Sequence, residues 1–253
     1  MRVVIKFAYD GRKFHGYARQ PKLTTVEGEL INSLVKYVFI EDTKESFFRS
    51  ASRTDKDVSA LGNVVAFNTD SSKKRILEEL SNEFSSILVY GIKDIEPDFN
   101  PRHAKLRHYV YYLPVANLDI EKIISTSACF TGEHNFSNFA RLESFKDPVR
   151  TIHNIIFTLE DDFLIVDFYA QTFLWHQIRR IVSALIKVGS SKLEKEQIIV
   201  ALQNPDKKVD FGLAPAEQLV LRDIIYDFDF EYDKKMLKEL DLLEEKIFLS
   251  LLK

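Results

Sequence analysis

The order in which hydrophobic periodicity changes along the first 95 residues constrains the fold more than any other feature. Six segments share this pattern, with strand-like alternation at 2–9, 45–51, 62–68 and 86–93 and helical spacing at 25–38 and 72–84. The first helix has a start signal at Thr24-Thr25 and acidic residues in its first turn. Strand-helix-strand-strand-helix-strand is the order of the split βαβ motif, which we therefore predict here.

A similar pattern restarts after Pro97 and Pro101. We expect strands near 106–113, 151–160, 163–171 and 219–228, and helices near 119–127, 173–188, 193–203 and from about 234. The sequence thus predicts an α+β protein with a soft boundary at Ile95-Glu96-Pro97. Its two halves, 1–97 and 98–253, are each ferredoxin-like and are expected to share an antiparallel sheet with a central active-site cleft.

Composition narrows the class of protein. The chain has 253 residues, of which 45% are apolar, enough to bury a core without cross-links. Its single cysteine, Cys129, excludes an intrachain disulfide, and no Cys/His cluster has the spacing of a zinc site. No apolar run is long enough to cross a membrane. We expect a cytoplasmic protein that binds neither a structural metal nor a membrane.

The distribution of charge matters more than its total of −3. Residues 226–247 hold eight acidic residues and four lysines, so the rest of the chain carries a net charge of +1. This leaves room for a basic cleft that would bind nucleic acid. The candidate arginines for such a cleft are Arg49, Arg53, Arg102, Arg107, Arg150 and Arg179, although scattered surface arginines would give the same count.

The segment 47–60 leaves one predicted strand, passes through small and polar residues around Asp55, and enters the next strand. Loops on a rigid scaffold often carry function, yet a solvated hairpin is the commoner explanation for an acid in such a place. Asp55-Lys56-Asp57-Val58-Ser59 also approximates the nucleophile motif of haloacid-dehalogenase-like phosphatases. That motif needs a preceding apolar strand and a magnesium site, whereas Arg53 and Thr54 precede Asp55 here.

The loop and four other segments of the chain resemble the motifs of one known family. Arg53-Thr54-Asp55 followed by Val58-Ser59-Ala60 resembles a signature of the TruA family of tRNA pseudouridine synthases. Four further segments resemble that family's motifs in the family's order, namely Tyr9-Asp10-Gly11 with Phe14-His15-Gly16-Tyr17 and Arg19-Gln20, Phe99-Asn100-Pro101-Arg102 with Arg107-His108-Tyr109-Val110-Tyr111, Phe173-Leu174 with His176-Gln177-Ile178-Arg179, and Gly212-Leu213-Ala214-Pro215-Ala216. The resemblance implies the pseudouridine synthase fold.

Three positions depart from the family's pattern. Ser52, Asp57 and Gln218 stand where the family usually has glycine. A glycine after the nucleophile suggests a positive φ, and aspartate tolerates the left-handed region better than most residues. We therefore expect Asp57 to preserve the turn. Ser59, where bacterial members usually have histidine, is more like archaeal and eukaryotic relatives.

The resemblance also implies an activity. Members isomerise uridine to pseudouridine in the anticodon stem-loop of tRNA, at positions 38 to 40, act as homodimers and need no cofactor. Asp55 would be the nucleophile, because a carboxylate can attack the flipped-out nucleotide and leave again. A non-catalytic RNA-binding module on the same scaffold is the alternative.

The resemblance assigns five more residues. Arg179 would pair with Asp55 and keep it ionised, and Tyr109 would stack on the extruded uracil and assist proton transfer. Arg53 would help to flip the nucleotide, and Arg107 and Leu219 would bind the substrate, although Tyr109 and Leu219 equally suit a packed core.

A helical wheel separates Arg179 from its neighbour. An apolar stripe is predicted at Leu174, Ile178, Ile181, Val182 and Leu185. Arg179 lies on the flank of this stripe and is expected to reach a cleft. Arg180 points nearly opposite and is expected to be solvated. His15, His103 and His176 are expected to be structural or to contact RNA rather than to catalyse.

Overall fold

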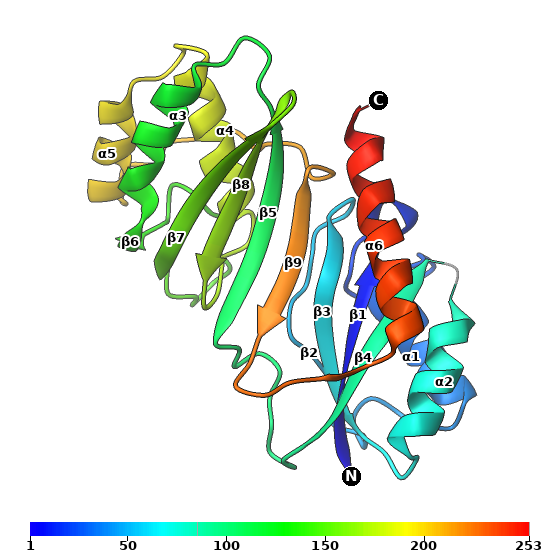
Figure 1. Ribbon diagram of the computed structural model, residues 1–253. Helices are drawn as coiled ribbons and strands as arrows, with labels where there is room; N and C mark the ends of the chain where they lie inside the picture. The colour runs from blue at the N-terminus through cyan, green and yellow to red at the C-terminus, as the bar shows by residue number, and fades with distance from the viewer. Residues whose placement is uncertain (85, 253) are drawn as a thin grey trace. The chain divides into compact units, whose positions relative to one another are not determined.

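The computed structural model describes residues 1–84 and 86–252, which fold into two compact units (Figure 1). Unit 1 comprises Met1–Lys105 and Val220–Lys253, and unit 2 comprises Leu106–Leu219. Each unit combines a mostly antiparallel sheet with helices, so the predicted α+β class is confirmed. The halves 1–97 and 98–253 stay a prediction; in the compact units, residues 220–253 belong with the N-terminal segment.

Unit 1 begins with the predicted split βαβ motif. Its elements are β1 (Arg2–Tyr9), α1 (Val26–Lys36), β2 (Arg49–Ser50), β3 (Ser59–Asn68), α2 (Lys73–Glu83) and β4 (Ile87–Ile95). The strands lie in the order β4-β1-β3-β2, and all neighbours are antiparallel, as in ferredoxin-like folds. A single 3-10 turn, η1 (Gly11–Lys13), follows β1.

The end of the chain extends this sheet. Strand β9 (Leu219–Ile225) pairs in parallel with the start of β3, and β10 (Glu231–Tyr232) pairs with β4. The last helix, α6 (Lys234–Leu249), packs on β4 and β3 and ends in η3 (Ser250–Leu252).

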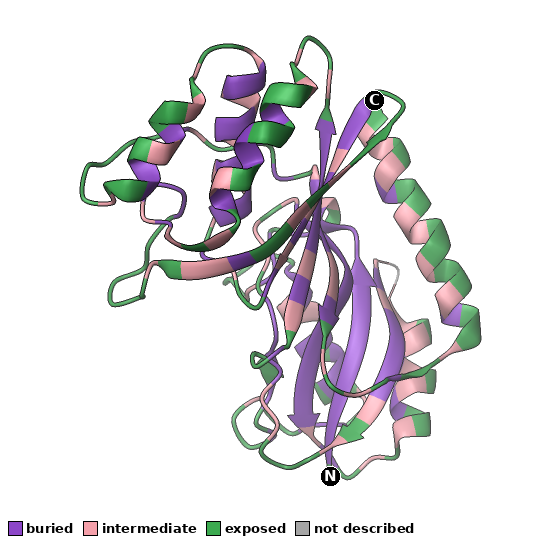
Figure 2. Ribbon diagram, turned by 60° about the vertical axis from the view of Figure 1, so that its left-hand side comes forward, coloured by how far each residue is buried: buried purple, intermediate pink, exposed green. Residues whose placement is uncertain are grey.

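Strand β1 is the centre of the unit 1 core. All eight of its residues are buried, including two with charged side chains, and Figure 2 shows the central strands of this unit in purple. The guanidinium of Arg2 donates to the Phe99 carbonyl oxygen at 2.8 Å, and Lys6 pairs with Asp223 at 2.5 Å. These contacts offset the cost of burying two charges. Both tie the segments after β4 and in β9 to the central strand.

Two local predictions in unit 1 have different outcomes. The start of α1 is confirmed, because the Thr25 side chain accepts the Gly28 N–H at 3.3 Å. The strand predicted at 45–51 is wrong in length and shrinks to β2. The carboxylate of Asp42 accepts two N–H groups, and Phe47 has a φ of 48°, so the chain turns just before β2 instead of extending.

Unit 2 has the order strand-helix-strand-strand-strand-helix-helix, which matches unit 1 up to its second helix apart from one additional short strand. Its elements are β5 (Leu106–Pro114), α3 (Ile120–Ser127), η2 (Ala128–Phe130), β6 (Gly132–Asn135), β7 (Val149–Glu160), β8 (Phe163–Ala170), α4 (Gln177–Gly189) and α5 (Lys195–Gln203). The strand order is β5-β8-β7-β6, with antiparallel neighbours. As β3 lies between β1 and β2, so β8 lies between β5 and β7, which agrees with a second ferredoxin-like half.

The core of unit 2 forms between one sheet face and α4. The predicted apolar stripe is confirmed, because all five of its residues are buried and four of them lie on α4. On the sheet, Tyr109 lies directly opposite the buried Phe168 of β8, so their side chains share the buried face. The helix itself starts at Gln177 rather than 173, since His176 adopts a left-handed conformation with a φ of 64°. Within the described residues, no helix combines the length and apolar character that a membrane crossing requires.

Candidate active site

The loop that carries Asp55 joins β2 to β3 and is held by the segment that follows β1. The Tyr9 hydroxyl hydrogen bonds with the Thr54 hydroxyl at 2.8 Å, and the Tyr17 N–H donates to the Thr54 carbonyl oxygen at 3.3 Å. Tyr9 and Tyr17 are both buried. The residue just before Asp55 is therefore fixed through both its side chain and its backbone.

Two glycines of the same segment allow the loop to come close. A Cβ atom on Gly11 would lie 2.2 Å from the Val58 carbonyl oxygen, which leaves no space for any side chain. The Gly11 N–H donates to the Ser59 hydroxyl at 3.0 Å in a buried bond. Gly16, with a φ of 98°, lies against the backbone of Lys56. The structure thus explains both glycines of the segment 9–17, because the absence of a side chain lets their backbone contact the Asp55 loop.

The loop itself turns at Asp57. The Val58 N–H donates to the Asp55 carbonyl oxygen at 3.3 Å, and Asp57 has a φ of 69°. The prediction that Asp57 takes the left-handed conformation of the family's glycine is confirmed. Ser52 does not have a positive φ; its carbonyl oxygen accepts Nδ2 of the wholly buried Asn63 at 3.1 Å. Asn63 was not singled out in the sequence, and only its polar character inside an apolar strand marks it.

The side chains of the loop differ in exposure. Asp55 is half-buried and Arg53 is exposed, whereas Val58 and Ser59 are buried. The loop therefore has a fixed backbone and presents its acidic and basic side chains towards solvent to different degrees. It also connects two antiparallel strands, which does not match the parallel, doubly wound sheet expected for a phosphatase of the haloacid dehalogenase type.

In unit 2, Arg179 is fixed by the loop that contains Gly212–Ala216. Its Nε donates to the Ala214 carbonyl oxygen at 2.8 Å, and the Ala214 N–H donates to the Arg179 carbonyl oxygen at 3.1 Å. Arg179 is half-buried on α4. The reciprocal bonds set the direction of the side chain.

The expectation for Arg180 is wrong. Its side chain is only 23% exposed, and its Nη1 pairs with Asp210 at 3.0 Å. The helical wheel does not show this contact because Asp210 comes from a loop 30 residues later in the chain. The Gly212 N–H and Arg180 together lower the pKa of Asp210, so the pair is ionised at neutral pH.

The other predicted residues of unit 2 are mostly packed. Tyr109 is 8% exposed and meets Phe173 edge-on, with ring centroids 5.4 Å apart. Arg107, on the same strand, is 6% exposed and donates to the Gln171 carbonyl oxygen. Leu219 is buried where β9 begins. These positions are compatible both with a core and with the wall of a site.

Gln218, the third residue that stands where the family usually has glycine, has a hydrogen-bond partner. The hydroxyl of Tyr111 donates to Oε1 of Gln218 at 2.7 Å, and burial raises the pKa of Tyr111. Gln218 therefore supplies an acceptor for a phenol that is otherwise enclosed, and holds the end of the 212–218 loop against β5.

The six predicted site residues divide between the units. Asp55 and Arg53 belong to unit 1, while Arg107, Tyr109, Arg179 and Leu219 belong to unit 2. Of the histidines, His15 and His103 are exposed and His176 forms the left-handed N-terminal cap of α4. The structural or RNA-contacting role of these three histidines stays a prediction.

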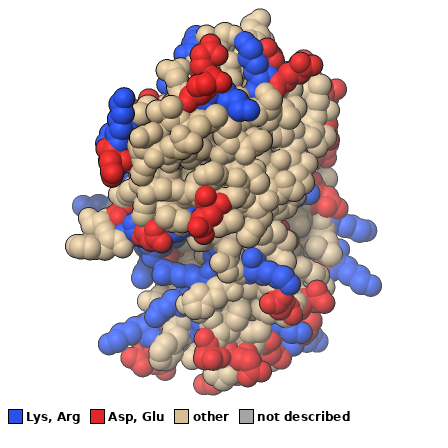
Figure 3. Space-filling model, turned by 90° about the vertical axis from the view of Figure 1, so that its left-hand side faces the viewer, with Lys and Arg blue, Asp and Glu red and all other residues tan. Residues whose placement is uncertain are grey.

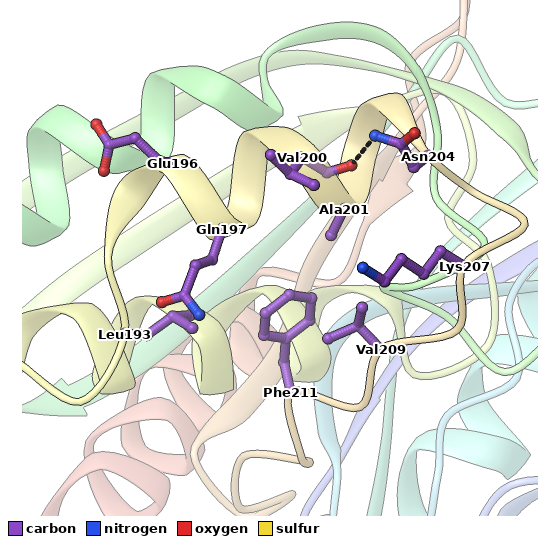
Figure 4. A pocket seen from close by; sticks show the side chains of 9 residues that line it. All are labelled: Leu193, Glu196, Gln197, Val200, Ala201, Asn204, Lys207, Val209 and Phe211. Carbon is purple, nitrogen blue, oxygen red and sulfur yellow. Dashed lines mark hydrogen bonds between the residues drawn. The ribbon is translucent and has the colours of Figure 1, made fainter.

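An apolar pocket of about 300 Å³ lies elsewhere in unit 2 (Figure 4). Its walls come from α5 and the loop after it, with Val200, Val209 and Phe211 facing the space. The lining includes Glu196 and Lys207 at its edge but none of the six predicted site residues. This pocket is therefore not a candidate for the chemistry.

The chain is similar to known proteins over most of its length. A family model described as tRNA pseudouridine synthase matches residues 127–227. The tRNA pseudouridine synthase A of Thermococcus sibiricus is 44% identical over 237 residues, covering 92% of this chain and 88% of that protein. The protein of the same name from Pyrococcus furiosus is 39% identical over 242 residues, covering 94% and 89%.

Solved structures give a weaker likeness. A chain in the crystal structure of a Cbf5-Nop10-Gar1 complex aligns with 73% of this chain and 45% of its own length. The TM-score is 0.38 and the sequence identity 15%. This chain thus spans less than half of that structure's chain, and the likeness bears on neither activity nor site.

Proposed function

Because the chain belongs to the tRNA pseudouridine synthase A family, we propose that it acts on the anticodon stem-loop of tRNA, at positions 38 to 40, with Asp55 as its nucleophile. The enzyme is an isomerase that converts uridine in tRNA to pseudouridine. The observation that carries the role of Asp55 is the fixed backbone around it. The segment 9–17, in which Tyr9, Gly11 and Tyr17 are buried, holds both sides of the loop, while the Asp55 side chain stays half-exposed.

The chemistry suits a carboxylate. The bond from N1 of uracil to C1′ of the ribose breaks, the base rotates, and a bond from C5 to C1′ forms. C5 loses its proton and N1 gains one, so atoms and charge balance. Asp55 attacks either C1′ or C6, forms a covalent intermediate and is released again at the end. The reaction needs no oxidant and no cofactor.

Arg179 is the proposed partner of Asp55. A guanidinium that pairs with a carboxylate favours its charged form and offsets the desolvation that a bound nucleotide imposes. The hydrogen bond from Nε to the Ala214 carbonyl oxygen fixes the direction of the Arg179 side chain. Arg179 therefore acts by keeping the nucleophile ionised and oriented.

The remaining residues handle the nucleotide. A uridine in a stem must leave the stack before the enzyme can reach it. Arg53, which is exposed, takes part in flipping the nucleotide, and Tyr109 stacks on the extruded uracil and assists proton transfer. Arg107 and Leu219 complete the binding site. We further propose that the enzyme acts as a homodimer in the cytoplasm.

The test compares two neighbouring carboxylates. Asp55→Asn is expected to lower tritium release from C5-labelled tRNA by at least about 1,000-fold, because an amide is a poor nucleophile. Asp57→Asn is the matched control, since asparagine also tolerates a positive φ and the change removes a charge two residues away. The control is expected to keep most of its activity.

Two outcomes would contradict the proposal. Equal tritium release from wild type and Asp55→Asn would remove Asp55 from the chemistry. Loss of activity in both variants would show that the charge of the loop matters, rather than one nucleophile. Mapping of pseudouridine in tRNA incubated with the enzyme tests the positions separately.

A further inference from the structure

A second pocket, of about 480 Å³, lies wholly within unit 2 and contains none of the residues proposed for catalysis. Three segments form it: residues 137–142, the first turn of α4 and residues 208–210. Its size is that of a site for a small molecule or for part of a larger ligand.

The charges that line this pocket are mostly positive. Arg141, Arg180 and Lys208 face one carboxylate, Asp210, so the lining has a net charge of +2 in a chain whose total is −3. Asp210 is already engaged by Arg180 and by the Gly212 N–H. Two basic side chains of the lining, Arg141 and Lys208, are exposed. The positive charges of the lining therefore exceed its negative charge, which favours the binding of an anion.

Arg180 adds an observation of a different kind. Its Nε is buried and has no hydrogen-bond partner among the described residues, although the side chain pairs with Asp210 through Nη1. A buried N–H donor without a partner is costly and unusual. Arg180 also lines the pocket, where its guanidinium contributes positive charge.

The pocket has a rigid frame. Buried Asn138 accepts the Val209 N–H at 3.1 Å and donates to the Ala201 carbonyl oxygen at 2.9 Å, which fixes the loop after α5. The Arg141 N–H donates to the Trp175 carbonyl oxygen at 2.8 Å. These bonds fix the backbone at Arg141 and beside Lys208 before any ligand is present.

An aromatic ring lies at the edge of this frame. The guanidinium of Arg141 stands over the Trp175 ring at 4.1 Å, and Trp175 remains 40% exposed. Stacked aromatic and guanidinium planes are surfaces on which unpaired RNA bases stack. Basic donors for a phosphate and a plane for a base therefore occur side by side.

From these contacts we infer that the pocket binds a phosphodiester of the tRNA outside the reacting nucleotide. Arg141, Arg180 and Lys208 contact the phosphate, and the Arg141–Trp175 stack supports an adjacent base. The inference rests on the proposed function only in taking tRNA as the substrate. Figure 3 shows one face of the molecule, on which Lys and Arg side chains lie beside Asp and Glu side chains around a broad uncharged area.

The experiment uses the fluorescence of Trp175, the only tryptophan of the chain. Full-length Asp55→Asn protein is titrated with tRNA, so that binding is read without turnover. The emission of Trp175 is expected to change and to saturate with the dissociation constant found by filter binding. Inorganic phosphate at the same concentrations is expected to leave the emission unchanged.

The variant that tests the phosphate contact is Lys208→Gln, in the same Asp55→Asn background. We expect a several-fold higher dissociation constant for tRNA and a decrease of about 1 in the slope of log affinity against log salt. Lys192→Gln is the control, because Lys192 is exposed in the same unit beyond the far end of α4, about 18 Å along the helix. It is expected to change neither quantity. Arg141→Gln is a second variant at an exposed position and is expected to act like Lys208→Gln.

Three results would overturn the inference. One is an emission that stays constant while filter binding shows saturation by tRNA. Another is equal affinity and salt slope in Lys208→Gln, Arg141→Gln and the control. The third is displacement of tRNA from this site by inorganic phosphate at equal concentration, which would indicate a simple anion site. These results are independent of tritium release, so failure here is distinguishable from failure of the role of Asp55.

Discussion

Arg179 and Ala214 hold each other through two hydrogen bonds that run in opposite directions. Nε of Arg179 donates to the Ala214 carbonyl oxygen at 2.8 Å, and the Ala214 N–H donates back to the Arg179 carbonyl oxygen at 3.1 Å. The bonds join the first turn of α4 to the Gly212–Ala216 loop, so two sequence motifs that lie 35 residues apart form one local structure.

This relationship predicts that charge alone does not replace Arg179. Arg179→Lys keeps the positive charge but loses the planar guanidinium that can bond Ala214 and a carboxylate together. We expect Arg179→Lys and Arg179→Ala both to lower single-turnover rates by at least about 100-fold, with tRNA affinity changed by less than about threefold. Quench-flow kinetics and filter binding measure the two quantities. A large loss of binding with normal turnover would contradict the proposed role.

Asp57 allows a test of the left-handed turn. Asp57→Gly restores the residue that the family usually has and is expected to be neutral or to stabilise the protein slightly. Asp57→Ala should lower the free energy of unfolding by about 1 kcal/mol, because a residue with a Cβ atom and no local side-chain hydrogen bond is disfavoured at a φ of 69°. Urea denaturation compares the two. Equal stability of both variants would show that the conformation has no energetic cost.

The Tyr111–Gln218 contact predicts non-additive stability. Gln218→Gly removes the acceptor at 2.7 Å from a buried hydroxyl and should cost about 1–3 kcal/mol. In that background, Tyr111→Phe should cost less than in the wild type, because the hydroxyl no longer has its partner. A double-mutant cycle in urea measures the coupling. Additive effects would mean that the second contact of the hydroxyl, with the Pro215 carbonyl oxygen at 3.2 Å, suffices.

The ion pair of Asp10 and Arg12 predicts a pH dependence of stability. Burial opposes ionisation of Asp10, but the hydrogen bonds and charge of Arg12 outweigh it, so the pKa of Asp10 is lowered. A lowered pKa in the folded state gives stability that is present above the unfolded value, near 3.9, and is lost as the pH falls through the folded value. Asp10→Asn should therefore be less stable than wild type at pH 6, and the difference should shrink below about pH 4. A difference that stays constant down to pH 2 would contradict this assignment.

The sequence was sufficient for most elements because periodicity is local. The apolar stripe of α4 and the alternation of β1 appear in consecutive residues, and both were predicted correctly. The short length of β2 was not predicted. The turn before it depends on the hydrogen bonds that Asp42 accepts and on the positive φ of Phe47, which the alternation of apolar residues does not show. The strands β6 and β10 were missed since four and two residues are too few to show a period.

The features of the candidate site that depend on contacts between distant segments could not be predicted from the sequence. The left-handed φ of Asp57 could be predicted, because aspartate stands where the family's motif usually has glycine. The pairing of Arg180 with Asp210 did not follow from the helical wheel, which contains only residues of the same helix. Likewise, nothing in Gly11 by itself indicates that Val58 will lie against it, because their contact depends on the pairing of β1 with β3.

The contact of Gly11 with Val58 means that the Asp55 loop becomes ordered when the protein folds, not when it binds tRNA. The Asp55 loop takes its shape when the first and third strands pair, and its backbone already has its hydrogen bonds before RNA arrives. The entropy lost on ordering these residues is thus part of the folding reaction of the protein. Association with tRNA does not have to supply it again, so more of the free energy of binding is left for pulling a base out of its stack.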